Sequence, residues 1–178
     1  MVLIPLGGKA AAGRHTKVDS DVAEELMKLS WYWESNGYAR RAVRFRMPDG
    51  RRAIRHIYMH REVWCLAGKV IPDGHELDHI NGDKLDNRLY NLRPATTAQN
   101  QHNRKLNRKV GTSRYKGVSW YKPTGKWRAR IQHNGKEIYL GYFADEIEAT
   151  KAYDKAARQL FGEYARCNFP VEKEINNV

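Results

Sequence analysis

Four residues near the middle of the chain have the types and spacing of a site that cuts phosphodiester bonds. Asp78 directly precedes His79, Asn91 follows twelve residues later, and Asn100 follows after nine more. A single helix or strand cannot bring such spacings to one point, because its neighbours recur every two to four residues. A hairpin followed by a helix can. Carboxylate and amide oxygens suit a hard divalent cation, and a histidine beside it can activate water.

Each of the four side chains has an expected role. Asp78 and Asn100 are predicted to hold one divalent ion, Mg²⁺, with Mn²⁺ able to substitute. His79 is the expected general base, because its reference pKa of about 6.5 leaves it largely neutral at physiological pH. Asn91 is better suited to orient His79 or to clamp the hairpin than to bind metal. Taken singly, these residues could be a core histidine, a loop cap and turn residues; together they favour catalysis.

Histidines and a cysteine nearby suggest a zinc site as an alternative. The candidate ligands are His75, His79, His102 and Cys65. Their spacing lacks the paired ligands typical of zinc sites, so this alternative is disfavoured. His60, His75 and His102 are each expected to be structural or to contact phosphate rather than to act in catalysis.

Composition favours a nucleic-acid partner. The 178 residues contain 32 Lys and Arg against 20 Asp and Glu, a formal charge of +12 that is typical of polyanion binders. The two cysteines, Cys65 and Cys167, cannot form a disulfide scaffold and are expected to be small core residues. No apolar run is long enough to span a membrane, and the N-terminus is too broken by Pro and Gly for a signal peptide. We therefore expect an intracellular protein without a membrane partner.

Local patterns predict the elements that must position the motif. A strand at 76–80, a polar loop at 81–88 and a return strand at 89–94 form the hairpin. Thr96 then caps a helix, with Gln99 completing a capping box. The order is β-β-α.

The preceding residues mix one short helix with strands. Asp21 and Glu24 have capping-box spacing, and apolar residues follow at helical intervals. Strands are predicted at 31–33, 37–39, 42–45 and 53–59. Arginines cluster on this strand-rich region, which could be a solvated sheet edge but is better explained by a surface facing phosphates. The predicted DNA contacts are Arg40, Arg41, Arg44 and Arg52.

A basic segment connects the motif to the last part of the chain. Residues 104–114 contain five basic residues and no acid. This composition fits a soluble linker or the frayed end of the preceding helix, and we favour an arm that follows the DNA backbone. Its predicted contacts are Arg104, Lys105, Arg108 and Lys109.

Residues 115–170 predict a three-stranded antiparallel sheet with one helix on its apolar face. The segment 126–132 alternates apolar and basic residues, Asn134-Gly135 is a hairpin turn, and Asp145 and Gly162 bound an amphipathic helix. The open face of the sheet is basic and could be ordinary solvated surface, but DNA contact is favoured. The predicted contacts of this unit are Lys116, Ser119, Tyr121, Lys126, Arg128, Arg130, Gln132 and Tyr139.

The central motif resembles the HNH endonucleases of phages and mobile introns, in the subgroup where asparagine replaces the last histidine. The residues that carry the resemblance are Met59-His-Arg61, Leu77 through Asp83, Asn87, Asn91-Leu-Arg93 and Asn100. The resemblance implies a ββα-metal fold with a single divalent ion. It also implies Asp78 and Asn100 as ligands, His79 as base and Asn91 as the residue that orients it.

The last unit resembles an AP2/ERF DNA-binding domain. Tyr115-Lys-Gly-Val118, Gly125-Lys-Trp127, Leu140-Gly-Tyr-Phe143 and Asn168-Phe-Pro170 carry the resemblance. Plant AP2 domains place arginines where this chain has Ser119 and Tyr121, and an acid where it has Arg130. The fold therefore carries over, but the recognised base sequence does not.

Together these features predict an α+β protein in five segments: a strand-rich DNA-contacting region at 1–59, an HNH module at 60–105, a linker at 106–114, an AP2-like domain at 115–170 and a tail at 171–178. The expected function is a metal-dependent DNA endonuclease of homing type that nicks one strand of duplex DNA per binding event. It is expected to act as a monomer, with a dimer left open, in the cytoplasm of a bacterial host, encoded by a phage or mobile element and without a small-molecule substrate. The AP2-like domain is expected to supply affinity and site choice rather than chemistry. The alternative is a non-cleaving DNA-binding regulator on a degenerate HNH scaffold, and RNA binding is disfavoured.

Overall fold

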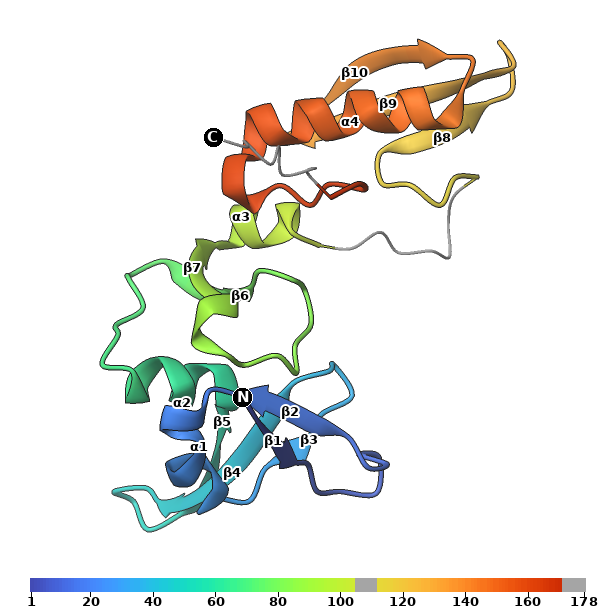
Figure 1. Cartoon of the computed structure of the whole chain (residues 1–178). Coiled ribbons are helices and arrows are strands. Elements are labelled where there is room, and N and C mark those ends of the chain that lie inside the picture. The colour runs from blue at the N-terminus through green and yellow to red at the C-terminus, as the bar shows by residue number, and fades with distance from the viewer. Residues whose placement is uncertain (105–111, 171–178) are drawn as a thin grey trace, which may run out of the picture. The chain divides into compact units, whose positions relative to one another are not determined.

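The computed structural model describes residues 1–104 and 112–170, which divide into two compact units, Met1–Thr97 and Ala98–Val178. Figure 1 shows helices and antiparallel strands in each unit, so the α+β prediction is confirmed. Among the described residues, no helix has the length and apolar character needed to cross a membrane.

The first unit opens with a hairpin and a short helix. Strands β1 (Val2–Pro5) and β2 (His15–Val18) pair antiparallel, and helix α1 (Ser20–Met27) follows directly. The predicted helix is present, but its first capping position is Asp19 rather than Asp21. The Asp19 carboxylate accepts a hydrogen bond from the main-chain N–H of Leu89 at 2.6 Å, so it fixes a distant loop instead of its own helix.

A three-stranded meander carries the N-terminal arginines. Its strands are β3 (Tyr32–Trp33), β4 (Ala39–Arg46) and β5 (Arg52–Tyr58), in the order β3-β4-β5. Helix α2 (Met59–Leu66) follows at once, and the sequence patterns did not predict it. Its buried residues include Val63 and Trp64, whereas Cys65 faces solvent. The prediction that Cys65 is a core residue is therefore wrong, because the helix turns the next position outward.

The predicted β-β-α order of elements is present. Strand β6 (His75–His79) pairs antiparallel with β7 (Leu92–Thr96), and α3 (Thr97–His102) follows. The return strand starts later than predicted, because residues Leu89–Asn91 form a 3₁₀ turn, η1. The core of the first unit gathers buried side chains from α1, α2 and two hairpins, β1-β2 and β6-β7. Among them are Val18, Leu26, Met59, Leu77 and Leu92.

The second unit contains the predicted sheet and helix. Strands β8 (Val118–Tyr121), β9 (Lys126–His133) and β10 (Lys136–Phe143) form an antiparallel sheet in the order β10-β9-β8. Helix α4 (Glu146–Phe161) packs along one face, followed by the 3₁₀ turn η2 (Gly162–Tyr164) (Figure 1). The Asp145 carboxylate accepts hydrogen bonds from the N–H groups of Ile147 and Glu148, which confirms the predicted cap.

The alternation predicted for β9 is also confirmed. Ala129 and Ile131 are buried under α4, while the basic residues between them face away. The sequence pattern also places Trp120 of β8 and Ile138 of β10 on this apolar face, but they are 38% and 37% exposed. Cys167 is half-buried beside the end of α4, so the core position predicted for it is wrong as well.

Candidate active site and DNA-facing surfaces

Strand β6 delivers the central pair of the motif. Asp78 and His79 are the last two residues of β6 and are 5% and 3% exposed. In the register of the hairpin, Asp78 lies opposite Arg93 and His79 lies opposite Leu92. Adjacent strand residues point to opposite faces, so the carboxylate and the imidazole leave the strand in different directions.

A chain of buried hydrogen bonds fixes the protonation of His79. The Thr16 hydroxyl donates to the main-chain oxygen of Leu85 at 2.9 Å, and the Asn87 Nδ2 donates to Thr16 Oγ1 at 2.7 Å. The Asn87 Oδ1 then lies 3.1 Å from His79 Nε2. A main-chain carbonyl oxygen can only accept a hydrogen bond, so the Thr16 hydroxyl must donate to Leu85 O. The same hydroxyl oxygen therefore accepts the bond from the Asn87 amide N–H. Asn87 therefore presents its oxygen to His79, whose Nε2 carries the proton and whose Nδ1 carries the lone pair.

The N-terminal hairpin holds this chain of bonds together. Asn87 and Thr16 are 1% and 0% exposed. Strand β2 lies against the loop before η1, where the N–H of Lys17 donates to Leu85 O at 2.7 Å and the N–H of Asn87 donates to Lys17 O at 2.8 Å. The sequence analysis gave no role to Thr16, since nothing in its local pattern indicates a partner about seventy residues away. Asn87 appeared only within the HNH resemblance.

Aromatic rings surround the His79 imidazole. The ring centroids of His60 and Tyr38 lie 5.3 Å and 5.9 Å from that of His79. Burial is the main cause that lowers the pKa of His79, although the bond to Asn87 and the nearby Asp78 act in the opposite direction. Burial, followed by His79 itself, lowers the pKa of His60 to about 3. His60 was expected to be structural or to contact phosphate, and it packs directly against the candidate base.

Asn91 clamps the loop that follows β6. Its Oδ1 accepts a hydrogen bond from the N–H of Asn81 at 3.0 Å. Its Nδ2 donates to Asn81 Oδ1 at 3.1 Å and to the main-chain oxygen of Asp86 at 2.7 Å. Of the two roles considered for Asn91, these bonds match the clamp, while the bond to His79 Nε2 comes from Asn87. A direct catalytic role for Asn91 stays a prediction.

The carboxylate of Asp78 is part of a buried ion pair. Arg93 donates to Asp78 Oδ2 from Nε at 3.1 Å and from a terminal guanidinium nitrogen at 3.0 Å. The second predicted ligand, Asn100, lies on α3 in the second unit, so its pairing with Asp78 stays a prediction. One carboxylate oxygen and one amide oxygen form a hard donor set, which fits an ion such as Mg²⁺ that keeps several waters.

The zinc alternative finds no support in the described part of the chain. Within residues 1–104 and 112–170, no group of three or more His, Cys, Asp or Glu side chains could hold a metal ion. Cys65, one of its proposed ligands, is exposed on α2.

The N-terminal arginines differ in their surroundings. Arg40 pairs with Glu34 at 3.1 Å, and Arg41 pairs with Glu62 at 3.4 Å. Their charge is partly neutralised within the fold, so they are weaker candidates for phosphate contacts than the exposed arginines of the same hairpin. The exposed members of the predicted set are Arg44 and Arg52.

The predicted contacts of the linker lie mostly outside the described residues. Arg104 is described and exposed, whereas Lys105, Arg108 and Lys109 fall in the range 105–111. Lys116 has another partner: its amine donates to the main-chain oxygens of His102 and Arg104 at 2.7 and 2.9 Å.

The open face of the sheet combines cations with tyrosines. Strand register places the predicted residues on the face opposite α4: Ser119, Tyr121, Lys126, Arg128, Arg130, Gln132 and Tyr139. Arg130 is bonded there to Glu137 at 2.6 Å.

A β-bulge adds one residue that the sequence analysis missed. The register of β10 against β9 shifts between Tyr139 and Gly141, where Gly141 has φ +131°. Strict alternation would put Tyr139 and Tyr142 on opposite faces, but the bulge puts them on the same one. The Tyr142 ring stacks on Tyr121 with centroids 5.0 Å apart, and Arg128 lies 5.3 Å over Tyr121. Gly141 was the local signal for the bulge.

Comparison with known proteins agrees with this arrangement. Residues 57–102 match the HNH endonuclease family, and residues 113–163 match the AP2 domain. HNH endonuclease L560 of Acanthamoeba polyphaga mimivirus is 31% identical over 145 residues, which cover 80% of this chain and 68% of that protein. The chain belongs to the HNH endonuclease family. Family membership supports nuclease activity and a divalent metal, and the AP2 domain supports DNA binding.

Further relatives match different parts of this HNH endonuclease. Protein 3.8 of Escherichia phage T7 is 36% identical over 107 residues, which cover 60% of this chain and 87% of the phage protein. The AP2-like ethylene-responsive transcription factor TOE2 of Arabidopsis thaliana is 42% identical over 60 residues, which cover 34% of this chain but 12% of the plant protein. The similarity to the plant protein is thus confined to one domain.

Proposed function

We propose that this HNH endonuclease hydrolyses phosphodiester bonds of duplex DNA at a recognised site, with a divalent metal ion, as a homing-type enzyme that nicks one strand per binding event. The observation that carries the proposal is the Thr16–Asn87–His79 chain of hydrogen bonds. It supports the tautomer with the proton on Nε2, in which Nδ1 would be the basic nitrogen that a general base requires.

His79 would take the proton of the attacking water on Nδ1. Its lowered pKa keeps the imidazole neutral, and therefore basic, at physiological pH. Asn87 holds the ring in one orientation, so the lone pair stays directed to one place. Asp78 and Asn100 would hold the ion, proposed to be Mg²⁺ with Mn²⁺ as a substitute. When bound, the ion supplies stabilisation of the negative charge that develops on the phosphate.

The remaining segments would bring duplex DNA to this site. We assign DNA contact to residues 1–59, chemistry to 60–105, backbone tracking to the linker 106–114 and base reading to 115–170. Arg44 and Arg52 would contact phosphates. On the AP2 sheet, Arg128 and the tyrosines would contact bases and sugars in the major groove.

A His79→Gln variant separates the base from the fold. Glutamine can still donate to Asn87 Oδ1 but has no basic nitrogen. We expect nicking of plasmid or end-labelled target in Mg²⁺ or Mn²⁺ to be lost in this variant, with DNA affinity and unfolding free energy close to wild type. Nicking by His79→Gln at the wild-type rate would refute the assignment of the base.

The same assay distinguishes the endonuclease from the alternative, a non-cleaving DNA-binding regulator. The wild-type protein should nick in the presence of metal and stop on addition of EDTA. Absence of metal-dependent nicking by wild type, on targets that it binds tightly, would favour a non-cleaving DNA-binding protein.

A further inference from the structure

The helix that carries Asn100 is too short to be stable by itself. Helix α3 has six residues and none of them is buried. Helices below about 12 residues are marginal in water unless tertiary contacts support them. Its main-chain oxygens at the C-terminal end also need donors from elsewhere. The stability of α3 must therefore come from contacts made by the rest of the chain.

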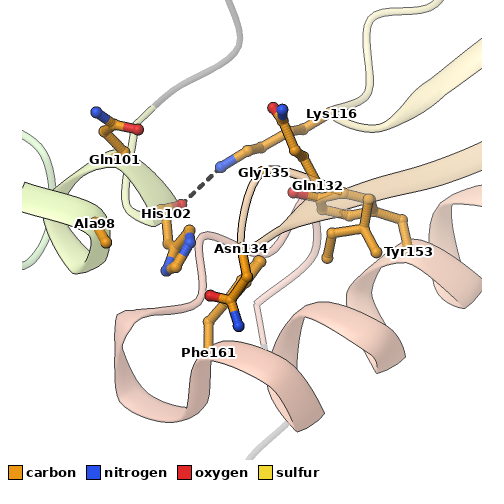
Figure 2. Close-up of a pocket in the computed structure, with 10 residues that line it drawn as sticks. Ala98, Gln101, His102, Lys116, Gln132, Asn134, Gly135, Tyr153 and Phe161 are labelled. Atoms are coloured by element: carbon orange, nitrogen blue, oxygen red, sulfur yellow. Dashed lines mark hydrogen bonds between the residues drawn. The ribbon is translucent and has the colours of Figure 1, made fainter. Parts of the chain in front are cut away.

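A lysine from the AP2 domain supplies those donors. Lys116 reaches the C-terminal end of α3, where its Nζ donates to the main-chain oxygen of His102 (Figure 2). The same Nζ also donates to the main-chain oxygen of Arg104. Burial is the main cause that lowers the pKa of Lys116, to about 8. A cation at a helix C-terminus is also favoured by the helix dipole. The lysine thus acts as a cap that the AP2 domain donates to a helix of the same compact unit.

An aromatic stack fixes the same end of α3. The His102 ring lies on Phe161, the last residue of α4, with centroids 3.7 Å apart and planes 14° from parallel. Burial lowers the pKa of His102, which keeps the imidazole neutral and suited to an apolar stack. A cavity of about 340 Å³ lies beside the stack, lined by Gln101, Lys116, Gln132 and others. The contact between the end of α3 and the AP2 domain therefore depends on a few side chains, chiefly Lys116, His102 and Phe161.

We propose that Lys116 and Phe161 are positioning residues: together with His102 they form a clasp by which the AP2 domain stabilises α3, the helix that carries Asn100. The inference rests on the proposed role of Asn100 as a metal ligand. It changes the expected division of labour, because the AP2 domain then contributes to the chemical step as well as to DNA affinity. Loosening the clasp weakens metal binding through Asn100 without removing any ligand.

The test uses full-length variants that loosen the clasp and keep side-chain bulk. Lys116→Met removes the donors, and Phe161→Leu removes the flat ring. Lys116→Arg and Phe161→Tyr are the conservative rescues. Lys151→Met, an exposed lysine on α4, is the matched control.

Amide hydrogen exchange of the metal-free protein tests the clasp itself. The N–H groups of Asn103 and Arg104 donate to the main-chain oxygens of Gln99 and Gln101, so they report the last turn of α3. We expect exchange there to be about tenfold faster or more in Lys116→Met and Phe161→Leu, and unchanged in the control and the rescues. Equal exchange rates in wild type and both loosened variants would overturn the clasp.

Metal titration tests the consequence for the site. In both loosened variants we expect the half-saturating Mn²⁺ concentration for nicking to rise by about 10- to 100-fold. The Kd for DNA should stay nearly unchanged in Phe161→Leu, whose side chain is not among the predicted DNA contacts. Faster exchange with unchanged metal dependence would overturn the positioning role. Wild-type metal dependence in Asn100→Ala would overturn the ligand assignment and the positioning step with it, while the exchange result would still report on the clasp.

Discussion

The buried hydroxyl of Thr16 should control the activity of a histidine that it does not touch. Thr16→Val keeps the shape of the side chain and removes the hydroxyl. The main-chain oxygen of Leu85 then loses its donor from Thr16, and Asn87 Nδ2 loses its acceptor. Asn87 can turn its amide over, and His79 Nε2 loses the oxygen that keeps its proton in place. Thr16→Ser is the matched control, because it keeps the hydroxyl and removes a methyl group.

The two substitutions should differ in stability and in rate. A buried polar group that loses its partner costs about 1–3 kcal/mol, so Thr16→Val should lower the free energy of unfolding by about 3 kcal/mol. Thr16→Ser should lower it by about 1 kcal/mol, the value of one buried methyl group. Loss of a partner that orients a catalytic group typically costs about 10- to 100-fold in activity, so we expect that decrease in nicking rate for valine and a nearly wild-type rate for serine.

Urea unfolding and single-turnover nicking measure these quantities. Nicking is compared at a temperature where circular dichroism shows all three proteins to be folded, so that the rate does not report unfolding. If the valine and serine variants nick equally fast, the hydrogen-bond chain does not set the protonation of His79, and the argument for Nδ1 as the base fails.

Three further predictions follow from other parts of the fold. A Cβ at Gly117, where φ is +79°, would overlap the ring of Tyr153, so Gly117→Ala should lower the unfolding free energy of the AP2 domain by about 3 kcal/mol in urea. The control Gly125→Ala, with φ +62° and open space around it, should cost about 1 kcal/mol; equal losses would refute the overlap. The folded pKa of His60 is about 3, so its contribution to stability is complete above the unfolded pKa of about 6.5 and falls as the pH drops below it. Between pH 7 and pH 5 the free energy of unfolding of the His60→Gln variant should therefore fall by about 2 kcal/mol less than that of wild type. An equal fall in the two proteins would contradict the burial of a neutral imidazole. Tyr142→Ala should weaken DNA binding by about 1–2 kcal/mol in fluorescence anisotropy while Tyr142→Phe should not; wild-type affinity of the alanine variant would exclude the tyrosine face from the interface.

Local sequence patterns correctly predicted the structural features that depend on residues close together in the chain. The Asp145 cap, the Asn134-Gly135 turn and the alternation along β9 depend on residues a few positions apart, and all three are present. The departures have non-local or irregular causes. The bulge before Gly141 brings Tyr142 to the open face, and helix α2 turns Cys65 outward.

The sequence by itself determined which chemistry we propose. Asp78, His79 and Asn100 have the side chains that a metal-assisted hydrolysis needs, and their spacing predicted the β-β-α frame that the structure contains. Only the tertiary structure decided which residues become hydrogen-bond partners around the proposed site. Thr16 meets Asn87 because β2 pairs with the loop before η1, and Lys116 meets the end of α3 because the AP2 domain packs there. Such contacts join residues far apart in the chain, so they follow from packing of the whole fold and leave no periodicity in the sequence.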